Sequence, residues 1–225
     1  MQYHIDTGLI YEKFNENSSC PLCAIKKIVE GQIVHEFLND AVMEDDTHIE
    51  VVNKGFCAEH FDLMFNNPNK LSLALQINAN ADNVRQLISA AKTAGGAKKL
   101  ADKIDKNLSS CVVCDYVEES MVKYYKTIAQ MFLHEKDFYK HLIRSHGFCM
   151  HHYAELLRYA SCAGFAAKDY VKMLADTQTR AFDDMQQKLN FFCKKHDYRN
   201  ALTPLGSAEN ALPEARERFY GKKPD

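Results

Sequence analysis

Apolar residues recur every three or four positions along several long segments of the chain, which is the pattern of an amphipathic helix. One segment runs from Ala24 to Val42, and a second runs from about Asp115 to Ser145. Gly31 interrupts the first at a cost of about 1 kcal/mol relative to alanine. A third stripe lies near the C-terminal end of the chain. Its members are Ala166, Tyr170, Met173, Thr177, Ala181, Met185, Leu189 and Phe192.

Turn signals separate these long segments from short ones. Gly55 and Gly147 each stand in a Gly-Phe-Cys sequence, and we expect each glycine to turn the chain before a short helix that begins near the cysteine. No segment shows the strict alternation, flanked by hairpin signals, that is typical of a strand. The sequence therefore predicts an all-α fold.

The motifs occur twice, which indicates an internal duplication. Ser18-Ser19-Cys20-x-x-Cys23 returns 91 positions later as Ser109-Ser110-Cys111-x-x-Cys114, and Gly55-Phe56-Cys57-x-x-His60 returns 92 positions later as Gly147-Phe148-Cys149-x-x-His152. The two copies align with one single-residue insertion. We expect two three-helix units, each with its own Cys3His metal site, packed as one helical protein. The predicted ranges are 1–95 and 96–200, followed by a C-terminal extension over 201–225.

Charge and hydropathy exclude several classes of protein. The formal net charge is −2, without the basic patch that a nucleic-acid-binding protein needs. The first residues lack the charged and apolar regions of a secretory signal. No apolar run approaches the roughly 18 residues needed to cross a bilayer. We therefore expect a cytoplasmic protein with neither a nucleic-acid nor a membrane partner.

Eight cysteines in a cytoplasmic protein need an explanation, because thiols are kept reduced there. A spaced pattern of cysteines then indicates metal binding or catalysis more often than disulfides. Zinc prefers four tetrahedral ligands drawn from thiolate and imidazole, often as two close pairs. A Cys-x-x-Cys sequence and a Cys-x-x-His sequence at the start of a helix are two such pairs.

We therefore predict two zinc ions per chain, each held by the two motifs of one repeat. The ligands of the first predicted sphere are Cys20, Cys23, Cys57 and His60. The ligands of the second are Cys111, Cys114, Cys149 and His152. An iron–sulfur cluster is the main rival occupant, because it also uses thiolates.

Two other interpretations of the cysteines stay open. They can be small buried thiols, or the pairs Cys20–Cys23 and Cys111–Cys114 can be redox disulfides, although no βαβ pattern accompanies them. Other candidates lie nearby: His146 and His151 beside the second sphere, Cys162, and the unpaired sequence Cys193-x-x-His196. Comparison of the repeats selects His152 and predicts that these other residues do not bind metal.

The duplicated Cys-x-x-Cys and Gly-Phe-Cys-x-x-His motifs resemble an uncharacterised bacterial family known only as a domain of unknown function. The resemblance covers essentially the whole chain. It includes Asp197-Tyr198-Arg199 and the helix start Ala211-Leu212-Pro213 near the C-terminus. Pro204-Leu205-Gly206 departs from the family's Pro-Trp-Gly at residue 205. The resemblance implies a helical cytoplasmic protein and no particular activity.

The sequence carries no catalytic signature, and whether the protein is an enzyme stays open, with the balance against it. A fully ligated zinc ion is normally structural, since catalysis needs an open coordination position. The favoured function is thus a metal-stabilised interaction or scaffold protein with an unidentified protein partner. The alternatives are a thiol-based redox or zinc sensor, and an enzyme with a cleft between the repeats near His134, Glu135 and His151.

Overall fold

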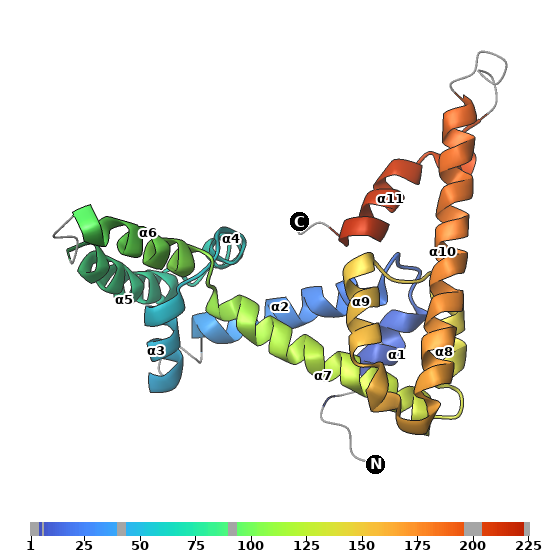
Figure 1. Cartoon of the computed structure of the whole chain (residues 1–225), viewed down its shortest axis with the longest axis horizontal. Helices are drawn as coiled ribbons and strands as arrows, with labels where there is room; N and C mark the ends of the chain where they lie inside the picture. Colours follow the sequence, from blue (N-terminus) through green and yellow to red (C-terminus); the bar gives the residue numbers. More distant parts are fainter. Residues whose placement is uncertain (1–4, 6, 40–43, 90–93, 196–203, 223–225) are drawn as a thin grey trace. The chain divides into compact units, whose positions relative to one another are not determined.

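The fold is all-α, as predicted, in a computed structural model that describes residues 5, 7–39, 44–89, 94–195 and 204–222; these residues contain no strand. Figure 1 shows the helices in chain order. The α-helices are α1 (Gly8–Asn15), α2 (Pro21–Asn39), α3 (Asp45–Lys54), α4 (Ala58–Phe65), α5 (Lys70–Ser89), α6 (Ala94–Leu108), α7 (Val112–His134), α8 (Phe138–Arg144), α9 (Met150–Arg158), α10 (Ala167–Lys195) and α11 (Ala211–Tyr220). The 3-10 helices are η2 (Ala160–Ala166) and η4 (Gly206–Ala208). Within this part of the chain, no helix has the length and apolarity needed to span a membrane.

The predicted helix boundaries are corrected in one place. The segment from Asp115 to Ser145 forms two helices, α7 and α8, because four consecutive polar residues (134–137) interrupt its apolar stripe. Phe138 then begins α8 and is fully buried against the rings of Tyr11 and Phe14. The predicted end of the first segment at Val42 lies outside the described residues, as do His196 and the Asp-Tyr-Arg sequence at 197–199.

Each Cys-x-x-Cys motif is followed by a long α-helix, two short ones and a second long one. After the first motif come α2, α3, α4 and α5 with 19, 10, 8 and 20 residues. After the second come α7, α8, α9 and α10 with 23, 7, 9 and 29 residues. The two series contain four helices each, so the predicted three-helix units are not confirmed.

The chain forms two compact units that do not coincide with the predicted ranges. The larger unit contains Met1–Lys27 and Met121–Asp225, and the smaller unit contains Ile28–Ser120. The smaller unit is thus inserted within the sequence of the larger one, and α2 and α7 each cross from one unit into the other. The ranges 1–95, 96–200 and 201–225 remain a prediction about the sequence repeat.

The larger unit has an aromatic core built where α1, α8 and α10 meet. The ring of Phe14 lies 5.8 Å from that of Phe138 and 6.0 Å from that of Phe148, measured between centroids. Tyr170 of α10 is fully buried and packs 5.2 Å from Phe132. Phe148 stands directly before Cys149, so this core fixes the start of α9.

The smaller unit has a core in which α3 packs on α5. The buried ring of Phe37 makes edge-on contacts with Phe56 and with Tyr116, at centroid distances of 6.3 Å and 5.4 Å. Phe56 stands directly before Cys57, and Tyr116 follows Cys114 by two residues. One buried aromatic residue therefore holds both cysteine-bearing segments of this unit.

Candidate metal centres

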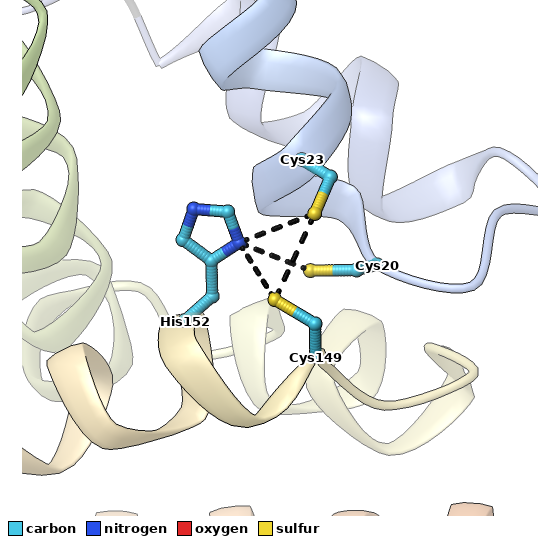
Figure 2. A group of neighbouring side chains, drawn as sticks. All are labelled: Cys20, Cys23, Cys149 and His152. Atoms are coloured by element: carbon cyan, nitrogen blue, oxygen red, sulfur yellow. Dashed lines mark hydrogen bonds between the residues drawn. The ribbon is translucent and has the colours of Figure 1, made fainter. Parts of the chain in front are cut away.

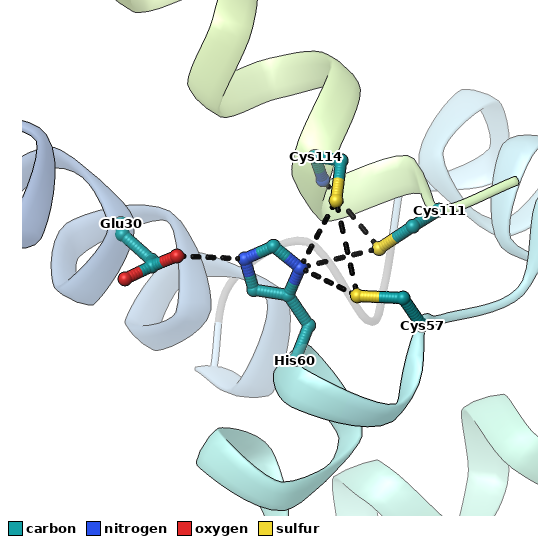
Figure 3. A network of polar contacts seen from close by, with 5 residues as sticks. All are labelled: Glu30, Cys57, His60, Cys111 and Cys114. Carbon is teal, nitrogen blue, oxygen red and sulfur yellow. Dashed lines mark hydrogen bonds and ion pairs between the residues drawn. The ribbon is translucent and has the colours of Figure 1, made fainter. Parts of the chain in front are cut away.

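All eight predicted ligand side chains gather into two groups, each with three cysteines and one histidine. We call the first group site 1; its members are Cys20, Cys23, Cys149 and His152 (Figure 2). We call the second group site 2; its members are Cys57, His60, Cys111 and Cys114 (Figure 3). Site 1 lies within the larger unit and site 2 within the smaller one.

The predicted pairing of the motifs is wrong. Each Cys-x-x-Cys gathers with the Cys-x-x-His of the other repeat, not with that of its own. Helix length supplies the reason. The 19 residues of α2, with Cys23 in its first turn, span about 28 Å, and the 10 residues of α3 span only about half that length. Cys57 therefore does not return to the start of α2, and His60 instead lies beside Glu30, in the middle of that helix.

A different segment reaches Cys57. After α5 and α6 the chain runs alongside the end of α3, where the Ser110 hydroxyl donates to the Lys54 carbonyl at 2.8 Å. The Val112 amide then donates to the Gly55 carbonyl at 3.1 Å. These hydrogen bonds bring the second Cys-x-x-Cys beside the first Gly-Phe-Cys and so assemble site 2.

The four ligand atoms of each site surround a common centre. In site 1, His152 Nδ1 lies 3.5 Å, 3.4 Å and 3.2 Å from the sulfurs of Cys20, Cys23 and Cys149. Cys23 Sγ lies 3.7 Å from Cys149 Sγ. All ligand atoms of the site lie within 4.8 Å of one another.

Site 2 repeats this arrangement. His60 Nδ1 lies 3.2 Å, 3.4 Å and 3.3 Å from the sulfurs of Cys57, Cys111 and Cys114. Cys57 Sγ lies 3.8 Å from Cys114 Sγ. A disulfide requires sulfurs about 2 Å apart, so all these cysteines are free thiols.

These distances match the edges of a tetrahedral zinc site. With zinc bonds of about 2.3 Å to sulfur and about 2.0 Å to nitrogen, a tetrahedron has S···S edges of about 3.8 Å and S···N edges of about 3.5 Å. The observed S···S distances of 3.7 and 3.8 Å and S···N distances of 3.2 to 3.5 Å fall close to these values. The donor set and its geometry both suit a metal ion.

The Gly-Phe-Cys turns are held by side-chain amides. Gly147 has φ +86°, and a Cβ on it would lie 2.6 Å from Ala181 Cβ, so only glycine fits against α10 there. Gln178 of α10 receives the Phe148 N–H at 3.0 Å and donates to the Phe148 carbonyl at 2.9 Å. Gly55, with φ +66°, lies against Asn80 of α5, whose amide donates to the Val51 and Val52 carbonyls at 3.2 Å and 3.0 Å. The cysteine after each turn is thereby placed on a fixed backbone.

Each site receives its ligands from the starts of two helices. Cys57 and Cys149 are the residues directly before α4 and α9, and Cys23 and Cys114 lie in the first turns of α2 and α7. A helix N-terminus carries partial positive charge, which favours thiolate over thiol. The fold therefore brings sulfurs from two helix N-termini together in each site.

In site 2 the pKa values of neighbouring groups move in opposite directions. Burial lowers the pKa of His60, but its hydrogen bonds with Cys111 and Glu30 outweigh burial and raise that pKa to about 10. Burial raises the pKa of Cys111, whereas its hydrogen bond with His60 brings it down to about 6. Burial and the neighbouring Cys111 raise the pKa of Cys114 far above its ordinary range.

Site 1 shows the same division. Hydrogen bonds from Cys20 and Cys23 lower the pKa of Cys149, and burial raises the pKa of Cys20. Burial lowers the pKa of His152, but hydrogen bonds with Cys149 and Cys23 raise it to about 9. In each site one thiol has a lowered pKa, Cys149 or Cys111, and a neighbouring thiol, Cys20 or Cys114, has a raised one. A divalent cation relieves the repulsion between neighbouring thiolates, so both sites are suited to hold one.

The two histidines have different support. His60 Nε2 lies 3.0 Å from Glu30 Oε1, a carboxylate placed behind a potential metal ligand (Figure 3). His152 Nε2 is buried, and among the described residues it has no hydrogen-bond partner. Glu30 lies seven residues after Cys23. In the second repeat, the residue seven positions after Cys114 is Met121.

The C-terminal extension covers site 1. Arg218 of α11 is buried and donates to the Ser19 carbonyl at 2.7 Å and to the Phe148 carbonyl at 3.4 Å, directly before Cys20 and Cys149. A Cβ on Gly221 would lie 3.4 Å from Cys23 Sγ and 3.6 Å from Cys149 Sγ. The backbone after α11 therefore rests on the sulfurs.

The remaining candidate residues stay outside both sites. His146, His151 and Cys193 are exposed, and Cys162 belongs to η2. The choice of His152 over its neighbours agrees with the grouping in the structure.

The residues named for an enzyme lie outside the cavity that the structure shows in the smaller unit. His134 and His151 are exposed, whereas Glu135 accepts a hydrogen bond from Tyr11. A cavity of about 530 Å³ exists in the smaller unit and contains none of them. It is lined by His48, Val52, Leu75, Gln76, Asn78, Ala79 and Asp82.

Sequence reasoning missed Glu30, Arg218 and Gly221. Glu30 stands where the two repeats differ, so alignment of the repeats contained a signal for it. Arg218 and Gly221 lie in the extension, which has no counterpart in the first repeat and offered no such signal.

One family model matches the chain over residues 1–225, and its description reads "Family of unknown function (DUF6062)". No curated protein and no solved structure matches the chain.

Proposed function

The chain belongs to the DUF6062 family, whose function is unknown, and from the arrangement of its cysteine and histidine side chains we propose that it is a zinc-binding helical protein in which both ions are structural. The observation that carries the proposal is the tetrahedral spacing of three sulfurs and one Nδ1 in each site. Four protein ligands complete the coordination sphere of zinc, and a catalytic zinc would need an open position.

The ions would act by joining distant helix starts. Site 1 links the start of α2 to the start of α9, and site 2 links α4 to α7. Apparent binding free energies of structural zinc in finger peptides are on the order of 10–16 kcal/mol, comparable with the whole stability of a domain. Each site would therefore stabilise the unit that contains it.

The test is the metal content of protein purified without chelator. We expect about two zinc ions per chain by elemental analysis and no visible absorbance from an iron–sulfur cluster. Metal near zero, with all eight thiols intact by titration, would contradict the proposal.

The broader role we propose is that of an interaction or scaffold protein. Its support is a set of exposed apolar side chains on α4 and α5, including the stacked rings of Phe61 and Phe65 and, further along, Leu71. Exposed apolar patches of this kind mark binding surfaces. Eight free thiols fit the reducing cytoplasm, which is our proposed location.

This role predicts a protein partner that depends on the α4–α5 surface. Phe65→Asp should abolish crosslinking to that partner in the native cell while leaving zinc content unchanged. Ile49→Asp is a matched control, because Ile49 lies on α3 and is 57% exposed, whereas Phe65 is 56% exposed. Equal loss of crosslinking in both variants would contradict a specific surface here.

A further inference from the structure

The sulfurs of the two sites differ in their access to solvent. In site 1, Cys20 and Cys149 are buried and Cys23 is partly exposed. In site 2, Cys111 is buried, Cys57 is partly exposed and Cys114 is exposed. Site 2 therefore contains an exposed cysteine, whereas site 1 contains none.

In site 1, the cysteine that corresponds to the exposed Cys114 of site 2 is covered by another part of the chain. The backbone at Gly221 rests on Cys23 and Cys149, and Arg218 ties this segment to the residues before the buried cysteines. Cys23 and Cys114 occupy equivalent positions in the two Cys-x-x-Cys motifs. The difference between them is thus due to their surroundings and not to the motif.

The exposed sulfur of site 2 has a second thiol within reach. Cys114 Sγ and Cys57 Sγ are 3.8 Å apart, so they need to approach by less than 2 Å to reach disulfide length. Cys114 is the more exposed of the two, and Cys57, directly before α4, is partly exposed. Cys111 is buried, and His60 is held from behind by Glu30. The pair most open to oxidation is Cys114 with Cys57.

We propose that site 2 is a hydroperoxide-sensitive thiol switch, in which Cys114 reacts with the peroxide and Cys57 closes a disulfide with it. The inference rests on the proposed function, because it takes zinc to be held at both sites before oxidation. It adds a specific modification site to that function and leaves site 1 as the permanent structural centre.

The reaction balances with a hydroperoxide as the only oxidant. The Cys114 thiolate attacks the terminal peroxide oxygen, the O–O bond breaks, and the departing alkoxide or hydroxide takes a proton and leaves as alcohol or water. Cys114 becomes a sulfenic acid. The Cys57 thiolate then attacks that sulfur, the S–S bond forms, the S–O bond breaks, and hydroxide leaves as water after taking a second proton. Two thiolates lose two electrons and the peroxide gains them.

The consequence for the fold is limited to site 2. Oxidation removes two of its four ligands, so the ion is no longer retained there. The new disulfide would still join the start of α4 to the start of α7, which are the same two points that the ion joined. The switch therefore changes metal content while it keeps this connection.

The experiment uses the full-length zinc-loaded protein with hydrogen peroxide in low molar excess. Zinc release is followed with a chromogenic chelator, and disulfides are mapped by mass spectrometry of peptides prepared without reduction. We expect about one zinc ion released per chain, a Cys57–Cys114 disulfide, and unmodified Cys20, Cys23 and Cys149. Cys114→Ser should lose this reaction, while Cys193→Ser, at an exposed cysteine outside both sites, should keep the Cys57–Cys114 disulfide.

The outcomes separate this inference from the proposed function. Two zinc ions per chain, with release from both sites at one rate, or a disulfide joining any other pair of cysteines, would overturn the switch and leave the structural role of zinc intact. A metal content near zero would overturn the proposed function. In that case, selective formation of the Cys57–Cys114 disulfide would still support the proposed reaction between these two thiols. If Cys114→Ser fails to fold, the peptide map of the wild-type protein decides the question alone.

Discussion

Site 1 and site 2 contain the same ligand set, drawn from the same two motifs, but their surroundings differ. In site 1 the side chains of Cys149 and His152 are 1% and 2% exposed, and the chain after α11 lies on the sulfurs. In site 2 Cys114 is exposed. The motif decides which atoms can bind metal, whereas the surrounding elements decide how easily a solute reaches those atoms.

The more exposed site contains the histidine with the better hydrogen-bond support. In site 2, Glu30 lies behind His60. In site 1, His152 Nε2 is buried and has no hydrogen-bond partner among the described residues. A carboxylate behind a ligating histidine fixes its tautomer and makes it a stronger ligand. Site 2 therefore combines an imidazole held by a carboxylate with an exposed cysteine. Burial of the cysteines and support of the histidine therefore rank the two sites in opposite orders.

The largest expected effect concerns which motifs share an ion. Cys23→Ser combined with Cys149→Ser removes ligands from site 1 alone, so about one zinc ion per chain should remain. Cys23→Ser combined with Cys57→Ser damages both sites, so almost none should remain. Elemental analysis of the two double variants decides the pairing. If instead the first double variant keeps almost no zinc and the second keeps about one ion, each site is built from the two motifs of one repeat.

The second effect concerns stability. Cys149→Ser leaves an incomplete sphere in a buried position, and we expect the melting temperature to fall by about 10 °C or more with helicity retained. Cys57→Ser should cost less, because site 2 is more exposed and its unit is smaller. Cys162→Ser is the control and should change neither metal content nor melting temperature. Far-UV circular dichroism and zinc analysis on the same samples test all three variants.

A third change should make site 1 behave more like site 2. Arg218→Gln removes the hydrogen bonds that hold the C-terminal segment over site 1. We expect zinc release from site 1 by a competing chelator to accelerate by about tenfold, as for other outer-shell substitutions. Arg85→Gln, at an exposed arginine on α5, controls for the loss of one positive charge. Equal release rates in the two variants would show that the segment does not protect the metal.

The smallest effect concerns Glu30. Glu30→Met gives site 2 the residue that the repeat has at the corresponding position, and we expect its zinc affinity to fall by about tenfold. Glu36→Met, at an exposed carboxylate on the same helix, is the control. Competition with a chelator of known affinity measures both. An unchanged affinity in Glu30→Met would mean that the hydrogen bond to His60 does not strengthen the ligand.

The fold class and the ligand residues could be predicted because each depends on local sequence. Three-to-four periodicity predicts helices directly, and it was misleading only where residues 134–137 interrupt the stripe and separate α7 from α8. The ligands were recognisable because Cys-x-x-Cys and Cys-x-x-His place two donors on one turn. Comparison of the repeats was enough to select His152 over His151.

The pairing could not be predicted from motif spacing, because it depends on how far each helix carries the chain. Helix α2 carries the chain away from Cys23 in its first turn, and the shorter α3 does not bring Cys57 back. The hydrogen bonds from Ser110 and Val112 bring the second Cys-x-x-Cys to Cys57 instead. The cover from Arg218 and Gly221 likewise comes from residues about 70 positions beyond Cys149.

The sequence by itself determined that the protein is helical and that eight particular side chains are potential metal ligands, because helix periodicity and motif geometry act over a few residues. Only the tertiary structure decided which motifs share a site, which sulfur meets solvent and which histidine has a carboxylate behind it. Those features depend on contacts between segments far apart in the chain, and such contacts are fixed by helix length and packing and not by the motifs themselves.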